Sequence, residues 1–226
     1  MPHETGAVIL YERKLSLREN AAAREAARPA KPRVPRLTLR KQNTSMNKTL
    51  RAVCESAMFC AFALALSYLK IPIGVSFGGF GGSIDLVMVP LILCAVRWGL
   101  GWGLAAGLVF GTLKFFLAGG VAINWESMLL DYSVAYMAVG LAGLFRRKPA
   151  LIGLAATVGC AARFAVHWLS GITIYAEYMS DIFGLTMTNV SVYSLLYNGS
   201  YMLPNTAAAI VCCLLLRKPL QKYLSN

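Results

Sequence analysis

Apolar residues in this chain come in long blocks that are separated by short polar or charged stretches. Blocks of roughly 20 apolar residues match the hydrocarbon core of a bilayer, which a helix crosses at ~1.5 Å per residue. The pattern therefore predicts an all-α membrane protein with six transmembrane helices. The expected bounds are residues 50–71, 83–96, 100–118, 126–145, 149–171 and 190–216.

Two breaks shape the start of this pattern. Pro72 ends the first segment, because proline removes a backbone donor, and five glycines within 74–82 predict a loop. The segment 83–96 is short for a span and contains Pro90, so of the six predicted helices it fits the length and composition of a transmembrane helix least well.

Basic residues predict the orientation in the membrane. Alternate segment ends carry Lys and Arg, which places these ends and both termini in the cytoplasm. The residues concerned are Lys48, Arg51, Arg97, Arg146, Arg147, Lys148, Arg217, Lys218 and Lys222. Lys70 and Lys114 fall near the opposite side, against this trend. We expect a multi-pass protein of the cell membrane, in contact with the lipid bilayer.

Residues 1–45 differ from the membrane domain, 46–226. They are basic, are interrupted by Pro29, Pro32 and Pro35, and have no apolar block, which predicts a disordered extension. A basic arm that touches anionic lipid is one alternative. Another is that translation starts at Met46, directly before the first apolar block.

Composition excludes several functions. The chain is 57% hydrophobic and 14% charged, whereas soluble domains carry about 25% charged residues. The net charge of +12 could suggest nucleic acid, but Lys and Arg flank apolar blocks instead of forming a basic face, so no nucleic acid is expected. The 6 cysteines form no CxxC pair and the membrane part has a single histidine, so neither a metal site nor a cofactor is expected.

Polar residues of three segments are predicted to meet near the outer side. Asp131 lies within the fourth segment, and Arg163, His167 and Gly171 share one face of the fifth at i, i+4 and i+8. Tyr193, Tyr197, Asn198 and Tyr201 open the sixth. A carboxylate, an imidazole, an amide and aromatic rings suit a small, flat, cationic or hydrogen-bonding ligand.

Structural explanations for these residues remain open at this point. The aromatic side chains could be interfacial anchors, His167 could pack between helices, and Asp131 could pair with Arg163. Pairing of His167 with Ser170, or of Asp131 with Glu126, could suggest an intramembrane enzyme. Neither pair belongs to a catalytic motif, so no enzyme is expected.

Small residues recur every fourth position in two segments. Gly99, Gly103, Gly107 and Gly111 predict close packing inside the bundle. Ala57, Ala61 and Ala65 could pack internally or could form a docking face for a partner helix. The glycines of 78–82 are not followed by Gly-Lys-Ser/Thr, so the chain is not expected to use ATP by itself.

Three stretches resemble one family in order. They are similar to helices four, five and six of thiamine-specific substrate-binding subunits of energy-coupling factor (ECF) transporters. The stretches are Leu129-Leu130-Asp131-Tyr132 with 140–146 (GLAGLFR) for helix four, 163–171 (RFAVHWLSG) for helix five, and 193–204 (YSLLYNGSYMLP) for helix six. The resemblance covers about Met46 to the end of the chain.

The resemblance implies six helices, thiamine binding and three partners, namely a membrane coupling subunit and two ATPase subunits. It assigns thiamine contacts to Asp131, Tyr132, His167, Gly171, Tyr175, Tyr193 and Asn198. It assigns coupling-subunit docking to Ala57, Ala61 and Ala65. The family's first-loop aromatic has no clean match, although Phe77 or Phe80 could serve. Alternatives are a self-contained ion-coupled thiamine carrier, or the same architecture with another vitamin as ligand.

Overall fold

The computed structural model describes residues 13–14, 16–19, 48–72, 82–179, 181–182 and 186–225. Contacts divide the chain into two units, Met1–Ser45 and Met46–Asn226. In the first unit, the described residues are helical, and the Ser16 hydroxyl donates to the Arg13 carbonyl at 3.1 Å. The rest of the predicted disordered extension lies outside the described residues, as do Phe77 and Phe80.

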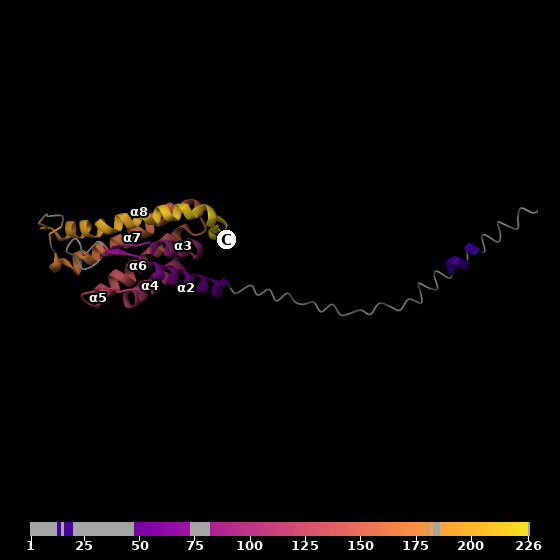
Figure 1. Cartoon of the computed structure of the whole chain (residues 1–226), viewed down its shortest axis with the longest axis horizontal. Helices are drawn as coiled ribbons and strands as arrows, with labels where there is room; N and C mark the ends of the chain where they lie inside the picture. Colours follow the sequence, from indigo (N-terminus) through magenta and orange to yellow (C-terminus); the bar gives the residue numbers. More distant parts are fainter. Residues whose placement is uncertain are drawn as a thin grey trace, which may run out of the picture. The chain divides into compact units, whose positions relative to one another are not determined.

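The second unit is a bundle of membrane-length helices (Figure 1). Among the described residues, five helical segments are long and apolar enough to cross a membrane. They are α2 (Lys48–Leu66), α4 (Leu100–Leu117), the composite segment Trp125–Phe145, η4 with α7 (Pro149–Leu151 and Ile152–Thr173), and α8 (Val190–Ser225). The described part of the chain is thus a helical, multi-pass membrane protein, which confirms the predicted fold class.

Helix α3 (Met88–Trp98) is the exception among the apolar segments. Its 11 residues extend about 16 Å, roughly half of a bilayer core. Residues 88–97 are all buried, with α2, α4, α7 and α8 in contact around them. The short helix is therefore shielded from lipid by its neighbours.

The predicted start of this helix at Ser83 is wrong. Ser83 and Ile84 form the two-residue strand β2 (Ser83–Ile84), which pairs antiparallel with β1 (Ile71–Pro72). Asp85 then accepts a hydrogen bond from the Val87 backbone at 3.3 Å, so its carboxylate precedes the helix. Two other predicted bounds also differ. The first helix ends at Leu66 and not at residue 71, and the last helix continues to Ser225 and does not end at residue 216.

The glycine row of α4 packs inside the bundle, as predicted. A Cβ atom on Gly107 would lie 2.2 Å from the Tyr136 carbonyl oxygen, and one on Gly111 would lie 2.2 Å from that of Tyr132. Only glycine allows this approach of the two backbones. The row therefore seats the Trp125–Phe145 segment directly on α4.

The two faces of α2 differ in their surroundings. Ala52, Ser56, Cys60 and Ala63 are buried, and the helix contacts α3 and α4. Ala57, Ala61 and Ala65 are all exposed, together with Met58 and Phe62. The predicted alanine row is therefore a surface of the bundle and not an internal contact.

A charged cluster ties the helices together near the C-terminus. The Glu55 carboxylate accepts from Arg51 Nε at 2.6 Å, from Trp98 Nε1 at 3.0 Å and from the Tyr223 hydroxyl. Arg97 Nε lies 3.5 Å from the same carboxylate, and its guanidinium faces the rings of Trp98 and Tyr223. We call these five residues the Glu55 cluster.

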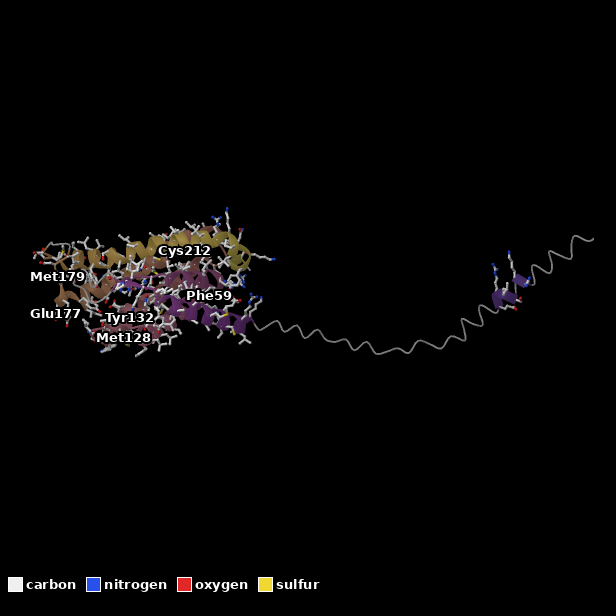
Figure 2. The ribbon with its side chains drawn as sticks, in the orientation of Figure 1. Phe59, Met128, Tyr132, Glu177, Met179 and Cys212 are labelled. Carbon is white, nitrogen blue, oxygen red and sulfur yellow. The ribbon has the colours of Figure 1, made fainter. Side chains whose placement is uncertain are left out.

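Figure 2 shows the opposite end of the bundle through its labelled residues. Tyr132, Glu177 and Met179 lie toward that end, whereas Phe59 and Cys212 lie nearer the end with the C-terminus. The short helix η5 (Ala176–Tyr178) and the strand pair belong to the connections there. We call this the cavity end.

Candidate functional site

A cavity of about 270 Å³ opens at the cavity end of the bundle. Its walls come from the strand pair, α4, the Trp125–Phe145 segment, α7, the turn after α7 and α8. All seven of the predicted ligand contacts line it: Asp131, Tyr132, His167, Gly171, Tyr175, Tyr193 and Asn198. Residues far apart in sequence are thus brought to one small-molecule-sized space.

A change of helix type positions the first two of these residues. The Trp125–Phe145 segment begins as α5 (Trp125–Met128), widens into a π-helix, η2 (Leu129–Val134), and continues through α6 (Ala135–Val139) and the 3₁₀ turn η3 (Gly140–Phe145). Asp131 and Tyr132 lie in the π-helical part, a form that is frequent at functional sites. The Tyr132 hydroxyl accepts from the Val121 backbone at 2.7 Å, which fixes the ring at the cavity wall.

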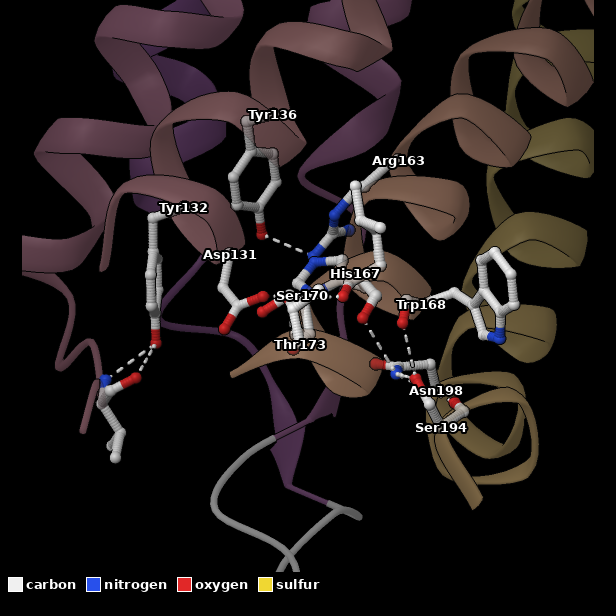
Figure 3. Close-up of polar contacts among 12 residues, drawn as sticks. Asp131, Tyr132, Tyr136, Arg163, His167, Trp168, Ser170, Thr173, Ser194 and Asn198 are labelled. Carbon is white, nitrogen blue, oxygen red and sulfur yellow. Dashed lines mark hydrogen bonds and ion pairs between the residues drawn. The ribbon is translucent and has the colours of Figure 1, made fainter. Parts of the chain in front are cut away.

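Asp131 pairs with His167 across the cavity wall (Figure 3). Its Oδ1 lies 3.3 Å from His167 Nδ1, and both side chains are largely buried. Because a carboxylate only accepts, this contact places the proton of a neutral imidazole on Nδ1 and leaves the lone pair on Nε2. The His167 Nε2 atom is buried without a hydrogen-bond partner among the described residues.

The alternative pairing of Asp131 with Arg163 is wrong. Arg163 Nη2 instead donates to the Tyr136 hydroxyl at 3.0 Å, and its guanidinium lies 4.2 Å from the centre of that ring. Tyr136 is one helical turn beyond Tyr132, on the same composite segment. The arginine therefore belongs to a second polar group, deeper in the bundle.

Gly171 and Asn198 lie where α7 and α8 approach most closely. A Cβ atom on Gly171 would meet the Ser194 hydroxyl at 2.1 Å. That hydroxyl donates to the Trp168 carbonyl at 2.9 Å, and Asn198 Nδ2 donates to the His167 carbonyl of α7 at 3.4 Å. Asn198 thus holds α8 against α7 while its side chain faces the cavity.

Aromatic rings form one side of the space. Tyr193 and Tyr197 stack at 6.0 Å with an interplanar angle of 5°, and Tyr197 meets Tyr201 edge to face. The Tyr201 hydroxyl donates to Asn198 Oδ1 at 2.6 Å. Burial, followed by the negative charge of Asp131, raises the pKa of Tyr175, so its phenol stays neutral. Flat neutral rings of this kind attract cations and planar heterocycles.

The floor of the cavity is a buried ionic network that the sequence analysis missed. Lys114 Nζ lies 2.9 Å from Asp85 Oδ2 and donates to the Tyr136 hydroxyl at 2.6 Å. Asn205 supports Asp85 by accepting from its backbone N–H at 2.7 Å. One signal was available, because a lysine and an aspartate in apolar surroundings of a membrane protein are expected to find each other.

Several polar residues of the same end do not line the cavity. Trp125 is 68% exposed, and Trp168 Nε1 donates to the Ser191 carbonyl at 3.3 Å. Glu177 and Asp181 are exposed. Across the described residues, no three His, Cys, Asp or Glu side chains gather as metal ligands. The cavity itself is lined by carboxylate, imidazole, amide and tyrosine groups, with Lys114 and Arg163 at its floor.

Fold and cavity together define a class, a multi-pass membrane protein that holds a small-molecule site within its helix bundle. The chain belongs to the family described as "Thiamine transporter protein" (Thia_YuaJ), whose model matches residues 53–224. Its membership rests on the whole membrane part of the chain and not on a single motif.

Two relatives support this assignment, and one solved structure shows the same fold. The thiamine transporter ThiT of Bacillus subtilis (strain 168) is 32% identical over a match of 190 residues, and the match covers 76% of this chain and 93% of that protein. ThiT of Lacticaseibacillus paracasei is 32% identical over a match of 181 residues, and the match covers 73% of this chain and 86% of that protein. A structure of ThiT from Listeria monocytogenes superimposes with a TM-score of 0.67 at 24% identity, covering 78% of this chain and 98% of that one, and shows the same fold.

Proposed function

We propose that this chain is the high-affinity thiamine-binding subunit of an ECF-type vitamin uptake transporter. Both curated relatives reported above are named thiamine transporters, and neither name describes an enzyme. The chain would capture thiamine at its cavity and deliver it through partner subunits. Transport and not catalysis is therefore its role.

The composition of the cavity carries this proposal. Thiamine combines a permanently cationic thiazolium ring with a flat aminopyrimidine ring. Asp131 supplies a negative charge, and Tyr175, Tyr193 and Tyr197 supply ring faces for the cation and the heterocycle. The His167 Nε2 lone pair is free to accept from an amino group. Each chemical feature of thiamine thus has a counterpart in the wall.

The proposed topology has six membrane segments and cytoplasmic termini. Five helices have the length of a span, and buried α3 would be the sixth segment, entering the membrane from the strand pair. With the Lys and Arg clusters on the cytoplasmic side, the cavity would open outward, where the vitamin arrives.

The exposed face of α2 is the proposed docking surface for the membrane coupling subunit. Ala57, Ala61 and Ala65 present small side chains to the surroundings, and small residues at this spacing allow a partner helix to approach closely. Two ATPase subunits would complete the complex, because this chain carries no phosphate-binding loop of its own.

Titration of the purified protein tests the proposal. We expect added thiamine to quench intrinsic fluorescence with saturation, while other vitamins at equal concentration do not. Liposomes that contain this chain alone and an ion gradient should bind thiamine without accumulating it. Accumulation would identify a self-contained carrier, and tighter binding of another vitamin would reassign the ligand.

A further inference from the structure

Four exposed cations lie at the end of the bundle that holds the C-terminus. They come from the turn before η4 and from the last turns of α8: Arg146, Arg147, Lys148 and Arg217. Residues 132–176 and 182–226 contain no Asp or Glu. Glu55, which lies at this end, is already engaged by Arg51 and Arg97. Among the described residues, none of the four cations forms an ion pair, so their charge is open to an external anion.

Packing between α7 and α8 brings the two sources of this charge together. The two helices lie side by side (Figure 1), and η4, which directly follows the turn 146–148, also contacts α8. A Cβ atom on Gly153 would lie 3.3 Å from the Leu214 side chain. From this contact the chain runs back to the turn on one side, and on the other it reaches Arg217 after a rise of about 4.5 Å. The four cations therefore belong to neighbouring elements at one end.

The turn is fixed in place and has a strained residue at its centre. Arg147 has a φ angle of 58°, in the left-handed region that favours glycine, and its backbone N–H donates to the Val96 carbonyl of α3 at 2.9 Å. The stem of Arg146 passes over Gly99, where a Cβ atom would lie 2.7 Å from Arg146 Cδ. Glycine would fit position 147 with less strain, so arginine costs folding free energy there. Such an outlier indicates a use for the side chain.

The surface beside the cations is apolar. Leu144 and Leu151 flank the turn, Leu214 lies one turn of α8 before Arg217, and all three leucines are exposed. In a membrane protein, exposed leucines face acyl chains, whereas Lys and Arg at the ends of the spans lie at the depth of the headgroups. A molecule that fits both surfaces has a negative headgroup and apolar tails.

We propose that the turn 146–148 and Arg217 form a binding site for an anionic glycerophospholipid, whose phosphate is held by the cations and whose acyl chains lie against the exposed leucines. Basic residues near a membrane surface attract anionic lipid, and a lipid that binds the folded bundle stabilises it against unfolding. The site is at the opposite end of the bundle from the cavity, so it does not depend on the ligand of the cavity.

Thermal unfolding in bilayers of defined composition tests the site. The full chain is placed in nanodiscs of phosphatidylcholine, with or without an equal part of phosphatidylglycerol, and fluorescence gives the unfolding midpoint. We expect phosphatidylglycerol to raise the midpoint of the native protein by about 3 °C or more, because bound lipid favours the folded state. The triple variant Arg146→Gln, Arg147→Gln, Arg217→Gln should lose most of that rise.

Two further variants separate the site from net charge and from folding. Arg13→Gln, Lys14→Gln and Arg18→Gln together remove the same charge from exposed positions of the N-terminal unit and should keep the native rise. Arg147→Gly relieves the left-handed strain, so its midpoint in phosphatidylcholine should be at least that of the native protein, while its rise with phosphatidylglycerol should be smaller. A structural role of Arg147 alone would change both midpoints alike.

Each remaining outcome has a definite meaning. Equal midpoints with and without phosphatidylglycerol, or an undiminished rise in the triple variant, would overturn the lipid site and leave the cations as a topology signal. If inorganic phosphate in phosphatidylcholine nanodiscs reproduces the rise, the site binds free anions and not lipid. If the triple variant keeps the rise but abolishes uptake, the surface contacts a partner subunit instead.

Two measurements keep the test independent of folding and of the proposed function. If the triple variant does not fold, the comparison of Arg147→Gly with the native protein decides. Thiamine affinity should remain native in every variant, because none of the substituted residues lines the cavity. Failure of the native protein to bind thiamine would affect the proposed function alone.

Discussion

The two ends of the bundle hold polar clusters of opposite character. In the Glu55 cluster, one carboxylate receives hydrogen bonds from Arg51, Trp98 and Tyr223, which come from three different helices. At the cavity end, Arg163 and His167 leave three buried nitrogen atoms without partners among the described residues. The Glu55 carboxylate thus receives three hydrogen bonds, as expected of a group that holds helices together, and the one buried nitrogen of its cluster without a hydrogen bond among the described residues, Arg97 Nε, lies 3.5 Å from that carboxylate in an ion pair. Several buried polar atoms without partners are expected where a ligand completes the network.

This comparison explains why similar residue types have different roles. An acid, arginines and aromatic rings occur at both ends, so composition does not distinguish them. The difference is geometric, because Glu55 is enclosed by its donors, while Asp131 and Arg163 face a cavity of about 270 Å³. The predictions below perturb one end at a time and are ordered by their expected effect on the cavity.

Lys114→Met should have the largest effect. It leaves the Asp85 carboxylate buried without its cation, and loss of one partner of a buried pair costs about 3–5 kcal/mol. Thermal unfolding in detergent, followed by fluorescence, measures the loss of stability. Lys218→Met removes an exposed lysine and is the control. Equal midpoints for the two variants would contradict a structural role of the floor network.

Gly171→Ala should disturb the contact between α7 and α8. The added methyl group would lie 2.1 Å from the Ser194 hydroxyl, and overpacking of this kind typically costs about 1–3 kcal/mol. We expect lower thermal stability and weaker thiamine binding. Gly153→Ala, on the same helix, places its methyl group 3.3 Å from the end of the Leu214 side chain and should change little. If both variants behave alike, the close approach at Gly171 is not required.

Asp131→Asn should weaken thiamine binding by at least roughly tenfold, or about 1.4 kcal/mol. The amide keeps the shape of the side chain but removes the charge that attracts the thiazolium. Fluorescence titration measures the affinity, and Glu126→Gln, which removes a nearby acid that does not line the cavity, is the control. Native affinity in Asp131→Asn would exclude Asp131 as the partner of the cation.

Glu55→Gln should separate stability from binding. Loss of the charge weakens several hydrogen bonds of the Glu55 cluster and should lower stability by about 1.5–3 kcal/mol. Thiamine affinity should remain within about twofold of the native value, because distant sites act independently. A large change in affinity would show that the two ends are energetically coupled.

Ala61→Trp should leave thiamine affinity unchanged while blocking uptake by cells. The residue is exposed on α2 and does not line the cavity, and a bulky ring would prevent a partner helix from approaching. Leu215→Trp adds a ring to an exposed position of α8 and should permit uptake. Normal uptake in Ala61→Trp would argue against docking at this face.

The sequence alone was sufficient for features that depend on local pattern. Long apolar blocks predicted membrane-length helices, because the bilayer sets the length of a span. The i, i+4 spacing of Arg163, His167 and Gly171 predicted a shared face, and the structure places all three at the cavity. The resemblance of three motifs indicated the thiamine transporter family, and the match of the family model to residues 53–224 then showed it.

Only the tertiary structure decided which polar groups pair and where the second segment begins. Asp85 meets Lys114 across 29 positions of sequence, and Arg163 meets Tyr136 across 27. Pairings of this kind depend on how helices pack, which periodicity does not specify. The same holds for the strand pair that delays α3, and for the Arg163 nitrogens, whose lack of partners depends on every neighbouring helix.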